Sequence, residues 1–143
     1  MNPEVMSENK SIFIDTAPFI YLIENNTKYS TKVEELLADY ISLNYNICSS
    51  VISYMEFCVI PDRDGRLDVI ESFNNLLLKL NISIFEINID VAIRGYKLRS
   101  SNPSLKGMDA LQLACALEND CSEFITNDEK LKKINEINVT ILH

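Results

Sequence analysis

Short apolar runs alternate with amphipathic segments along this 143-residue chain, and this alternation limits the folds open to it. The apolar runs favour buried strands, and the segments between them carry apolar residues at helical spacing. The predicted strands are residues 11–15, 46–50, 82–87, 123–126 and 138–142. The predicted helices are a segment from Pro18 to Ile23, one capped by Ser30 or Thr31, one over residues 51–60 that Pro61 ends, and residues 66–80, 90–100, 108–118 and 128–134. Strands that alternate with helices predict a three-layer α/β/α sandwich with a mainly parallel central sheet.

The chain length predicts a single domain over residues 11–143, preceded by a disordered lead at residues 1–10. That lead contains acidic residues and no apolar stretch, so it lacks the pattern of a signal peptide. No run of about 18 apolar residues is present, which argues against a membrane span. The four cysteines form no C-x-x-C pair and lie in apolar surroundings, a pattern typical of reduced thiols. We therefore expect a cytoplasmic protein.

The composition excludes several kinds of site. The three glycines, Gly65, Gly95 and Gly107, are too far apart for a G-x-G-x-x-G fingerprint or a P-loop. The one histidine is His143, the last residue, so we expect neither a Ser-His-Asp centre nor a zinc site built from imidazoles. The net charge of −8 argues against a simple basic nucleic-acid surface, but carboxylates that bind divalent cations remain compatible with a nuclease.

Four acidic residues occupy positions that favour a common site. Asp15 ends the first predicted strand, Asp128 follows the fourth, and Asp109 opens an alanine-rich helix. Ligands of parallel sheets bind at the carboxyl ends of the strands, where these three acids are expected to converge. Glu56 lies in a mostly apolar helix, where a buried charge is costly without a partner. Oxygen ligands without histidine or thiolate favour Mg²⁺ or Mn²⁺ over zinc.

Each acid also has a purely structural explanation. Ser53-x-x-Glu56 matches a capping box, and the stretch that begins at Thr126 matches a second one. Asp109 and Asp128 are placed where an acid stabilises the N-terminus of a helix through its dipole. For any one acid considered alone, this structural explanation is favoured over a functional one, and Glu56 is the hardest of the four to explain in this way.

Taken in order, four segments resemble the PIN domain family. They are Ile14-Asp15-Thr16, then Ser53-x-x-Glu56, then Asp109-Ala-Leu-Gln-Leu-Ala-Cys-Ala116, then Ile125-Thr-Asn-Asp128. Each segment is a weak signal, but the ordered set covers residues 11–142 and is fairly specific. Small single-domain members of this family are typically VapC-type toxins of toxin–antitoxin pairs.

The resemblance implies a metal-dependent endoribonuclease that hydrolyses RNA phosphodiester bonds with Mg²⁺ or Mn²⁺. It also implies a cognate antitoxin as a protein partner, as in a type II pair. The residues that the resemblance assigns to metal binding and catalysis are Asp15, Glu56, Asp109 and Asp128, with Thr126 and Thr16 as supporting hydroxyls. The alternative is a non-catalytic PIN-like module that binds protein or RNA.

Basic residues gather in the stretch that leads to Asp109. Within residues 91–108 no acid interrupts them, and they are Arg94, Lys97, Arg99 and Lys106. They are candidates for RNA phosphate contacts, and a solvated helix face explains them equally well. A second group, Lys130, Lys132 and Lys133, is better explained by the dipole of a short helix.

Two further expectations concern aromatic and apolar residues. Tyr21, Tyr54 and Tyr96 are able to stack on bases, although core packing is the favoured role for each. The helices predicted within residues 30–80 have more apolar residues than one buried face requires, which predicts a homodimer. The residues concerned include Tyr40, Ile41, Leu76 and Leu78.

Overall fold

The computed structural model describes residues 10–142, so most of the lead predicted at residues 1–10 lies outside the described part, as does His143. Five strands form one sheet in the order β3-β2-β1-β4-β5, and every pairing is parallel. The strands are β1 Ser11–Ile14, β2 Asn46–Ser50, β3 Ser83–Phe85, β4 Cys121–Thr126 and β5 Asn138–Ile141. The parallel sheet confirms the fold prediction, although β3 is shorter than expected.

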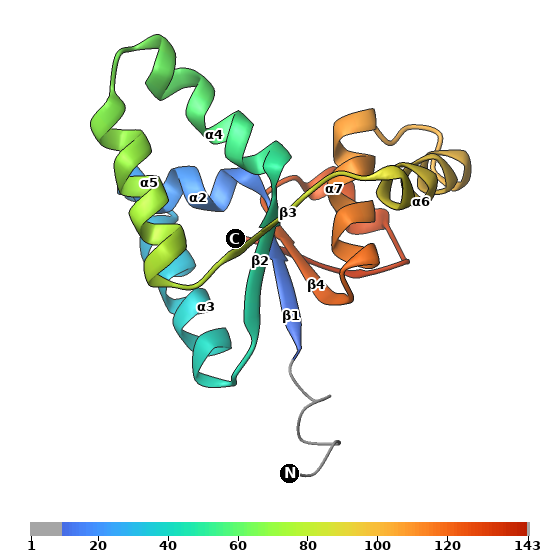
Figure 1. The fold of residues 1–143 in the computed structure, drawn as a ribbon. Coiled ribbons are helices and arrows are strands. Elements are labelled where there is room, and N and C mark those ends of the chain that lie inside the picture. The colour runs from blue at the N-terminus through green and yellow to red at the C-terminus, as the bar shows by residue number, and fades with distance from the viewer. Residues whose placement is uncertain (1–9, 143) are drawn as a thin grey trace, which may run out of the picture.

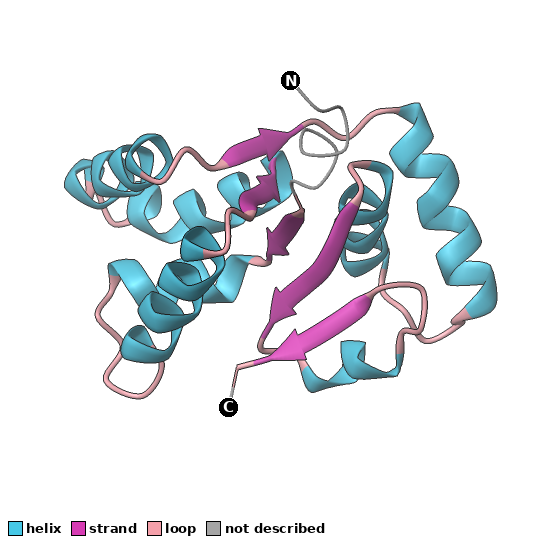
Figure 2. Cartoon of the chain, turned by 90° about the horizontal axis from the view of Figure 1, so that it is seen from below, coloured by secondary structure: helices cyan, strands magenta, loops and turns pink. Residues whose placement is uncertain are grey.

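Helices cover both faces of this sheet and complete the predicted three-layer sandwich. They are α2 Thr16–Ile23, α3 Ser30–Ser42, α4 Val51–Arg63, α5 Leu67–Lys79, α6 Ile89–Ser101, α7 Gly107–Glu118 and the short 3-10 helix η1 Glu129–Lys133. The layer of α2, α3, α4 and α5 lies on one face, and α6 and α7 lie side by side on the other (Figures 1 and 2). None of the described helices is both long and apolar enough to cross a bilayer.

Alternating side chains of β1 divide the core into two halves. Ile12 and Ile14 pack with the α2–α5 layer, whereas Phe13 packs with the α6–α7 layer. All three are essentially inaccessible to solvent, and burial of each contributes about 1.5–3 kcal/mol. Phe13 also stacks on Phe124 of β4, with ring centroids 5.2 Å apart. A strand buried on both faces in this way fits only the centre of a covered parallel sheet.

Helix α3 begins earlier than predicted. The prediction that Ser30 or Thr31 caps it is wrong, because Ser30 is already helical and Tyr29 is the N-cap without a side-chain cap. The side chain of Asn26 takes over this role one turn upstream, where its Oδ1 accepts the N–H groups of Lys28 and Tyr29. A short polar residue before the expected cap therefore sets the helix start.

Helix α4 runs past the proline that was expected to end it. Pro61 lies in the last turn, and the helix continues to Arg63. A proline there removes only one helical hydrogen bond, because the missing N–H is its own. The chain then turns at Gly65, whose φ of 68° is a left-handed conformation that glycine adopts without strain.

Candidate active site

Asp15 is held at the carboxyl end of the central strand by donors from three directions. It directly follows β1 and caps α2, where its Oδ1 accepts the backbone N–H of Thr16 at 2.9 Å. The hydroxyl of Thr126, at the end of β4, donates to Oδ2 at 2.8 Å. The Gln112 amide of α7 donates to Oδ1 at 3.3 Å. These contacts fix the carboxylate at the edge of the sheet where the sequence predicts the site.

Glu56 reaches the same edge from α4. Its Oε1 accepts the hydroxyl of Thr16 at 2.8 Å, so Thr16 links the start of α2 to α4. The expectation that Glu56 is buried among apolar residues is wrong, because the side chain is exposed. Its apolar sequence neighbours Met55 and Val59 are themselves about half exposed, since the buried face of α4 is on the other side.

The capping-box explanation of Glu56 is also wrong. Helix α4 begins after Ser50, whose hydroxyl accepts the N–H of Ile52 at 3.1 Å. Ser53 is fully buried and its hydroxyl accepts the Gln112 amide at 2.6 Å. Because another serine caps the helix, Glu56 is free of that structural role.

Asp109 lies in the first turn of α7 and is partly buried. Burial is the largest cause of a raised pKa of its carboxyl, which means that its charged form is disfavoured. The negative charges of the three other predicted acids raise this pKa further, while the positive charge of Lys106 lowers it. Asp15, Glu56 and Asp128 are therefore all close enough to Asp109 for their charges to repel its carboxylate.

Asp128 is tied to Asp15 through one hydroxyl. The backbone N–H of Asp128 donates to the hydroxyl of Thr126 at 3.1 Å, and that hydroxyl in turn donates to Asp15. The carboxylate of Asp128 caps η1 by accepting the N–H of Lys130 at 3.0 Å. The cap of this short helix is thus Asp128 itself, whereas the predicted capping box would place it at Thr126. The supporting position expected for Thr126 agrees with its contacts.

A buried amide beneath the acids joins three elements of the fold. Gln112 is only 2% exposed, and its amide nitrogen donates to both Ser53 and Asp15. Its carbonyl oxygen accepts the hydroxyl of Ser50. Gln112 is not among the predicted site residues, although a polar side chain within the alanine- and leucine-rich part of α7 indicates a buried hydrogen-bond partner.

The acids open onto a groove of about 780 Å³. Glu56, Asp109 and Asp128 line it, together with residues of α6 and of the start of α7. Of the four predicted RNA-contacting cations, Arg99 and Lys106 line this groove. Arg99 is anchored there, because its Nε donates to the carbonyl of Leu105 at 3.0 Å.

A family model and solved structures match this chain and its fold. The family model described as the PIN domain matches residues 12–137, which is most of the chain. The chain belongs to the PIN domain family. No curated protein matches it in sequence.

Solved structures share the fold of this PIN domain at low sequence identity. A toxin–antitoxin complex from Klebsiella pneumoniae has a TM-score of 0.71 and 23% identity, covering 92% of this chain and 98% of the other. VapBC2 from Rickettsia felis, bound to a promoter DNA fragment, has a TM-score of 0.73 and 18% identity, covering 93% and 99%. The Mycobacterium tuberculosis toxin VapC20, described as cleaving the sarcin–ricin loop, has a TM-score of 0.65 and 14% identity, covering 89% and 98%.

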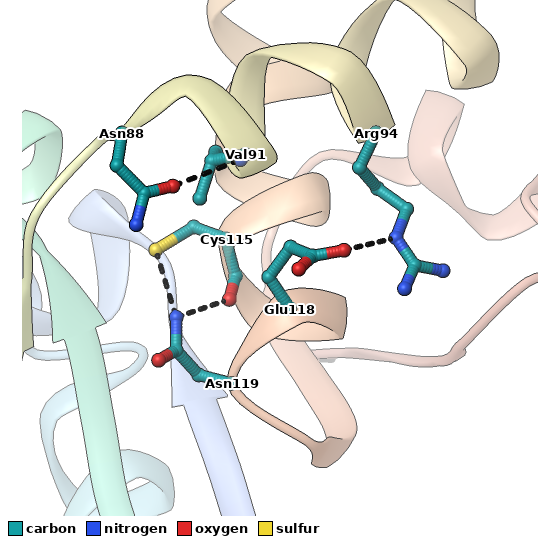
Figure 3. Close-up of polar contacts among 6 residues, drawn as sticks. All are labelled: Asn88, Val91, Arg94, Cys115, Glu118 and Asn119. Atoms are coloured by element: carbon teal, nitrogen blue, oxygen red, sulfur yellow. Dashed lines mark hydrogen bonds and ion pairs between the residues drawn. The ribbon is translucent and has the colours of Figure 1, made fainter.

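Two of the predicted RNA-contacting cations lie away from the acid groove of this PIN domain. Arg94 forms an ion pair with Glu118 of α7 at 2.8 Å, and Figure 3 shows this pair beside a set of structural contacts. In that set the Asn88 side chain caps α6, and the Asn119 amide donates to the Cys115 carbonyl at 2.8 Å. Lys97 lines the same shallow hollow as Arg94 and Glu118. This end of α6 thus serves the packing of α6 on α7.

The tyrosines divide between core and groove. Tyr21 stacks on Tyr29 with centroids 4.7 Å apart, and Tyr54 donates to Asn74 at 2.7 Å, so both pack as expected. The prediction of core packing is wrong for Tyr96, which is 60% exposed and lines the acid groove. The buried face of α6 is formed by other residues, Val91, Gly95 and Leu98.

The donors at the acid groove are carboxylates and hydroxyls, the ligands that suit Mg²⁺ or Mn²⁺. The mutual repulsion at Asp109 is also what a divalent cation would relieve. Within residues 10–142, no three Asp, Glu, Cys or His side chains stand close enough to enclose an ion. The residues therefore fit such an ion by donor chemistry and charge, and holding it requires the carboxylates to turn toward one point.

Proposed function

We propose that this PIN domain is a metal-dependent endoribonuclease that hydrolyses RNA phosphodiester bonds and acts as the toxin of a type II toxin–antitoxin pair. The observation that carries the proposal is the environment of Asp109, where the charges of three other acids repel its carboxylate at the carboxyl edge of the sheet. Ionisable groups with shifted pKa values occur more often at functional sites than elsewhere in a protein. The fold shared with toxin–antitoxin structures supports the same reading.

The acids would hold Mg²⁺ or Mn²⁺, with Asp15 and Asp109 as the principal ligands and Glu56 and Asp128 beside them. Such an ion, when bound, lowers the pKa of a coordinated water and offsets the charge of a phosphate. The protein's own contribution is orientation. Thr126 and Gln112 fix the carboxylate of Asp15, and Thr16 fixes that of Glu56. Arg99 and Lys106 are placed to contact RNA phosphates beside the acids.

The test is cleavage of a mixed RNA pool by the purified chain in Mg²⁺ and in EDTA. We expect cleavage in Mg²⁺ alone, and its loss in Asp109→Asn. A matched control is Glu35→Gln, the same acid-to-amide change at an exposed residue of α3 on the other helical layer. Cleavage that persists in EDTA or in Asp109→Asn would contradict the proposal.

The alternative is a non-catalytic module, and one observation favours it: within the described residues no three acidic side chains already form an ion cage. In that case the chain would bind RNA or protein without cleaving RNA. Absence of cleavage in both Mg²⁺ and Mn²⁺, together with retained RNA binding, would support the module.

Two partners belong to the proposal, an antitoxin and a second copy of this chain. The neighbouring reading frame tests the first: a small protein with a DNA-binding head should co-purify with the chain and block cleavage. The second is supported by exposed apolar residues on α3 and α5, among them Ile41 and Leu78, which is 80% exposed. Sedimentation of a single 16.3 kDa species at micromolar concentration would exclude the homodimer.

A further inference from the structure

One face of α6 forms a wall of the acid groove. Ala92, Gly95, Tyr96 and Arg99 follow one another at helical spacing and all line the groove. Ala92 and Gly95 are small and leave the wall hollow, with Gly95 closely packed on Leu111 of α7. Tyr96 and Arg99 line the groove on the C-terminal side of these two small residues. The same wall meets the start of α7, so it leads directly to Asp109.

Two large side chains in this groove face solvent without a packing partner that covers them. Tyr96 is 60% exposed and Met108 is 43% exposed. An aromatic ring and a thioether that line one groove offer polarisable apolar surface, and exposed apolar surface in a groove indicates a binding site.

Positive charge stands beside this apolar surface in a chain of net charge −8. Arg99 is fixed by its bond to Leu105, and its guanidinium lies 3.8 Å from the position where a Cβ on Gly107 would be. Lys106 precedes Gly107 and lines the same groove. An aromatic face next to two cations complements a nucleotide, which carries a flat base and an anionic phosphate.

We propose that this part of the groove is a subsite for an unpaired nucleotide of RNA, with its base stacked on Tyr96 and its phosphate on Arg99 and Lys106. The inference rests on the proposed function and assigns to Tyr96, Arg99 and Lys106 the binding of one nucleotide of its substrate. A base inside a duplex has both faces covered by its neighbours, so only an unstacked base offers a face to the Tyr96 ring. Stacking also tolerates any base, so the subsite selects strand state more than sequence.

The chain contains no tryptophan, so Tyr96→Trp provides a single fluorescent reporter in the groove. Oligoadenylate and oligouridylate are titrated in EDTA, which prevents cleavage during the measurement. We expect saturable quenching by the single strands and none by the duplex that the two form together. The matched reporter is Leu43→Trp, at a 67% exposed position next to α3 on the other face of the sheet, and it should not be quenched.

Affinity measured on the unlabelled variants gives a second, independent readout. Tyr96→Ala should weaken binding of oligoadenylate by about 5- to 100-fold, the loss expected for one base–aromatic stack. Tyr96→Phe keeps the ring and should retain the affinity of the native chain. Unchanged affinity in Tyr96→Ala, or equal quenching of the Leu43→Trp reporter, would overturn the subsite.

A parallel cleavage assay in Mg²⁺ separates this inference from the proposed function. Binding that depends on Tyr96 without cleavage would support the subsite and contradict the nuclease. Cleavage with an unchanged KM in Tyr96→Ala would support the nuclease and overturn the subsite. If the chain shows neither RNA binding nor RNA cleavage, both the subsite and the proposed function are overturned.

Discussion

Two grooves of similar size lie in different parts of the sandwich, and they differ in the surroundings of their acids. The acid groove, of about 780 Å³, is lined by Glu56, Asp109 and Asp128. The second groove, of about 680 Å³, lies between α3 and the β4–β5 edge of the sheet and contains Tyr40 and Glu123. Volume alone therefore does not single out a functional site in this fold.

Three acids line the second groove, Glu35, Asp39 and Glu123, and Glu123 has a hydrogen-bond donor. The hydroxyl of Tyr40 donates to Glu123, and burial together with this carboxylate raises the pKa of the Tyr40 phenol. In the acid groove, burial and three like charges raise the pKa of Asp109, and the positive charge of Lys106 opposes them. The comparison teaches that a partly buried carboxylate surrounded by like charges, rather than the presence of an acid or a hollow, distinguishes the candidate active site from the second groove.

The largest effect that would test this contrast is expected from Asp15→Asn. We expect cleavage to fall by at least about 100-fold, the upper end of the loss seen when only the surroundings of a metal ligand are changed. In the native chain three donors bond the carboxylate of Asp15. Its replacement by an amide should therefore also lower the free energy of unfolding by about 1–3 kcal/mol.

Melting with and without Mg²⁺ completes the Asp15→Asn test. A ligand that binds only the folded state raises its melting temperature, and this rise should be smaller in the variant. Cleavage at the native rate would refute the catalytic assignment. If cleavage is lost but Mg²⁺ raises the melting temperature of both proteins equally, Asp15 would instead contact the substrate or a water molecule and would not be a principal metal ligand.

The next effect is expected from Gln112→Leu, which removes the amide beneath the acids without changing its size greatly. The hydroxyls of Ser50 and Ser53 lose their buried partner, at a cost of about 1–3 kcal/mol by urea unfolding. The double variant Ser53→Ala with Gln112→Leu should recover part of this loss, because it removes both members of one bond. Additive losses in the double variant would show that the hydrogen bond between Ser53 and Gln112 does not itself stabilise the fold.

Much of the fold was predictable because its signals are local. Strand β1 contains a continuous apolar run, and the helices that follow it carry apolar residues at helical spacing. The errors lie at helix ends, where a single contact decides. Asn26 starts α3 earlier than Ser30 would, and Pro61 does not end α4. Such boundaries depend on individual hydrogen bonds that periodicity does not encode.

The site was predictable in its position but not in its environment. Parallel topology alone places Asp15, Asp109 and Asp128 at one edge. The exposure of Glu56 and of Tyr96 depends on which face of its helix meets the sheet, and both helices have apolar residues on more than one face. A sequence that is apolar on two faces leaves that choice to tertiary packing.

A smaller effect, confined to stability, is expected from Tyr40→Phe in the second groove. Removing the hydroxyl leaves Glu123 without its donor, which should cost about 0.5–1.5 kcal/mol and leave cleavage unchanged. The pKa of Tyr40 is raised in the folded state, so this contribution is present below the ordinary pKa of 10.0 and is lost as the pH rises above it. Tyr45→Phe, the same change in the adjacent ring, is the control. A loss of cleavage in Tyr40→Phe would mean that the two grooves are not independent.

The smallest effect has the opposite sign and comes from Asp109→Asn in the absence of divalent ions. The raised pKa of Asp109 means that the folded chain holds this proton more tightly than the unfolded chain does. Stability of the native chain should therefore fall as the pH rises from the ordinary value of 3.8 through the raised pKa, and the amide should lack this fall. Above that window the variant should be more stable by less than about 1 kcal/mol, because the carboxylate is partly exposed and its repulsion is screened by solvent. Urea unfolding in EDTA across this pH range measures the difference in stability between the two proteins. A variant that is less stable than the native chain at neutral pH would show that the surrounding acids do not destabilise the charged form of Asp109.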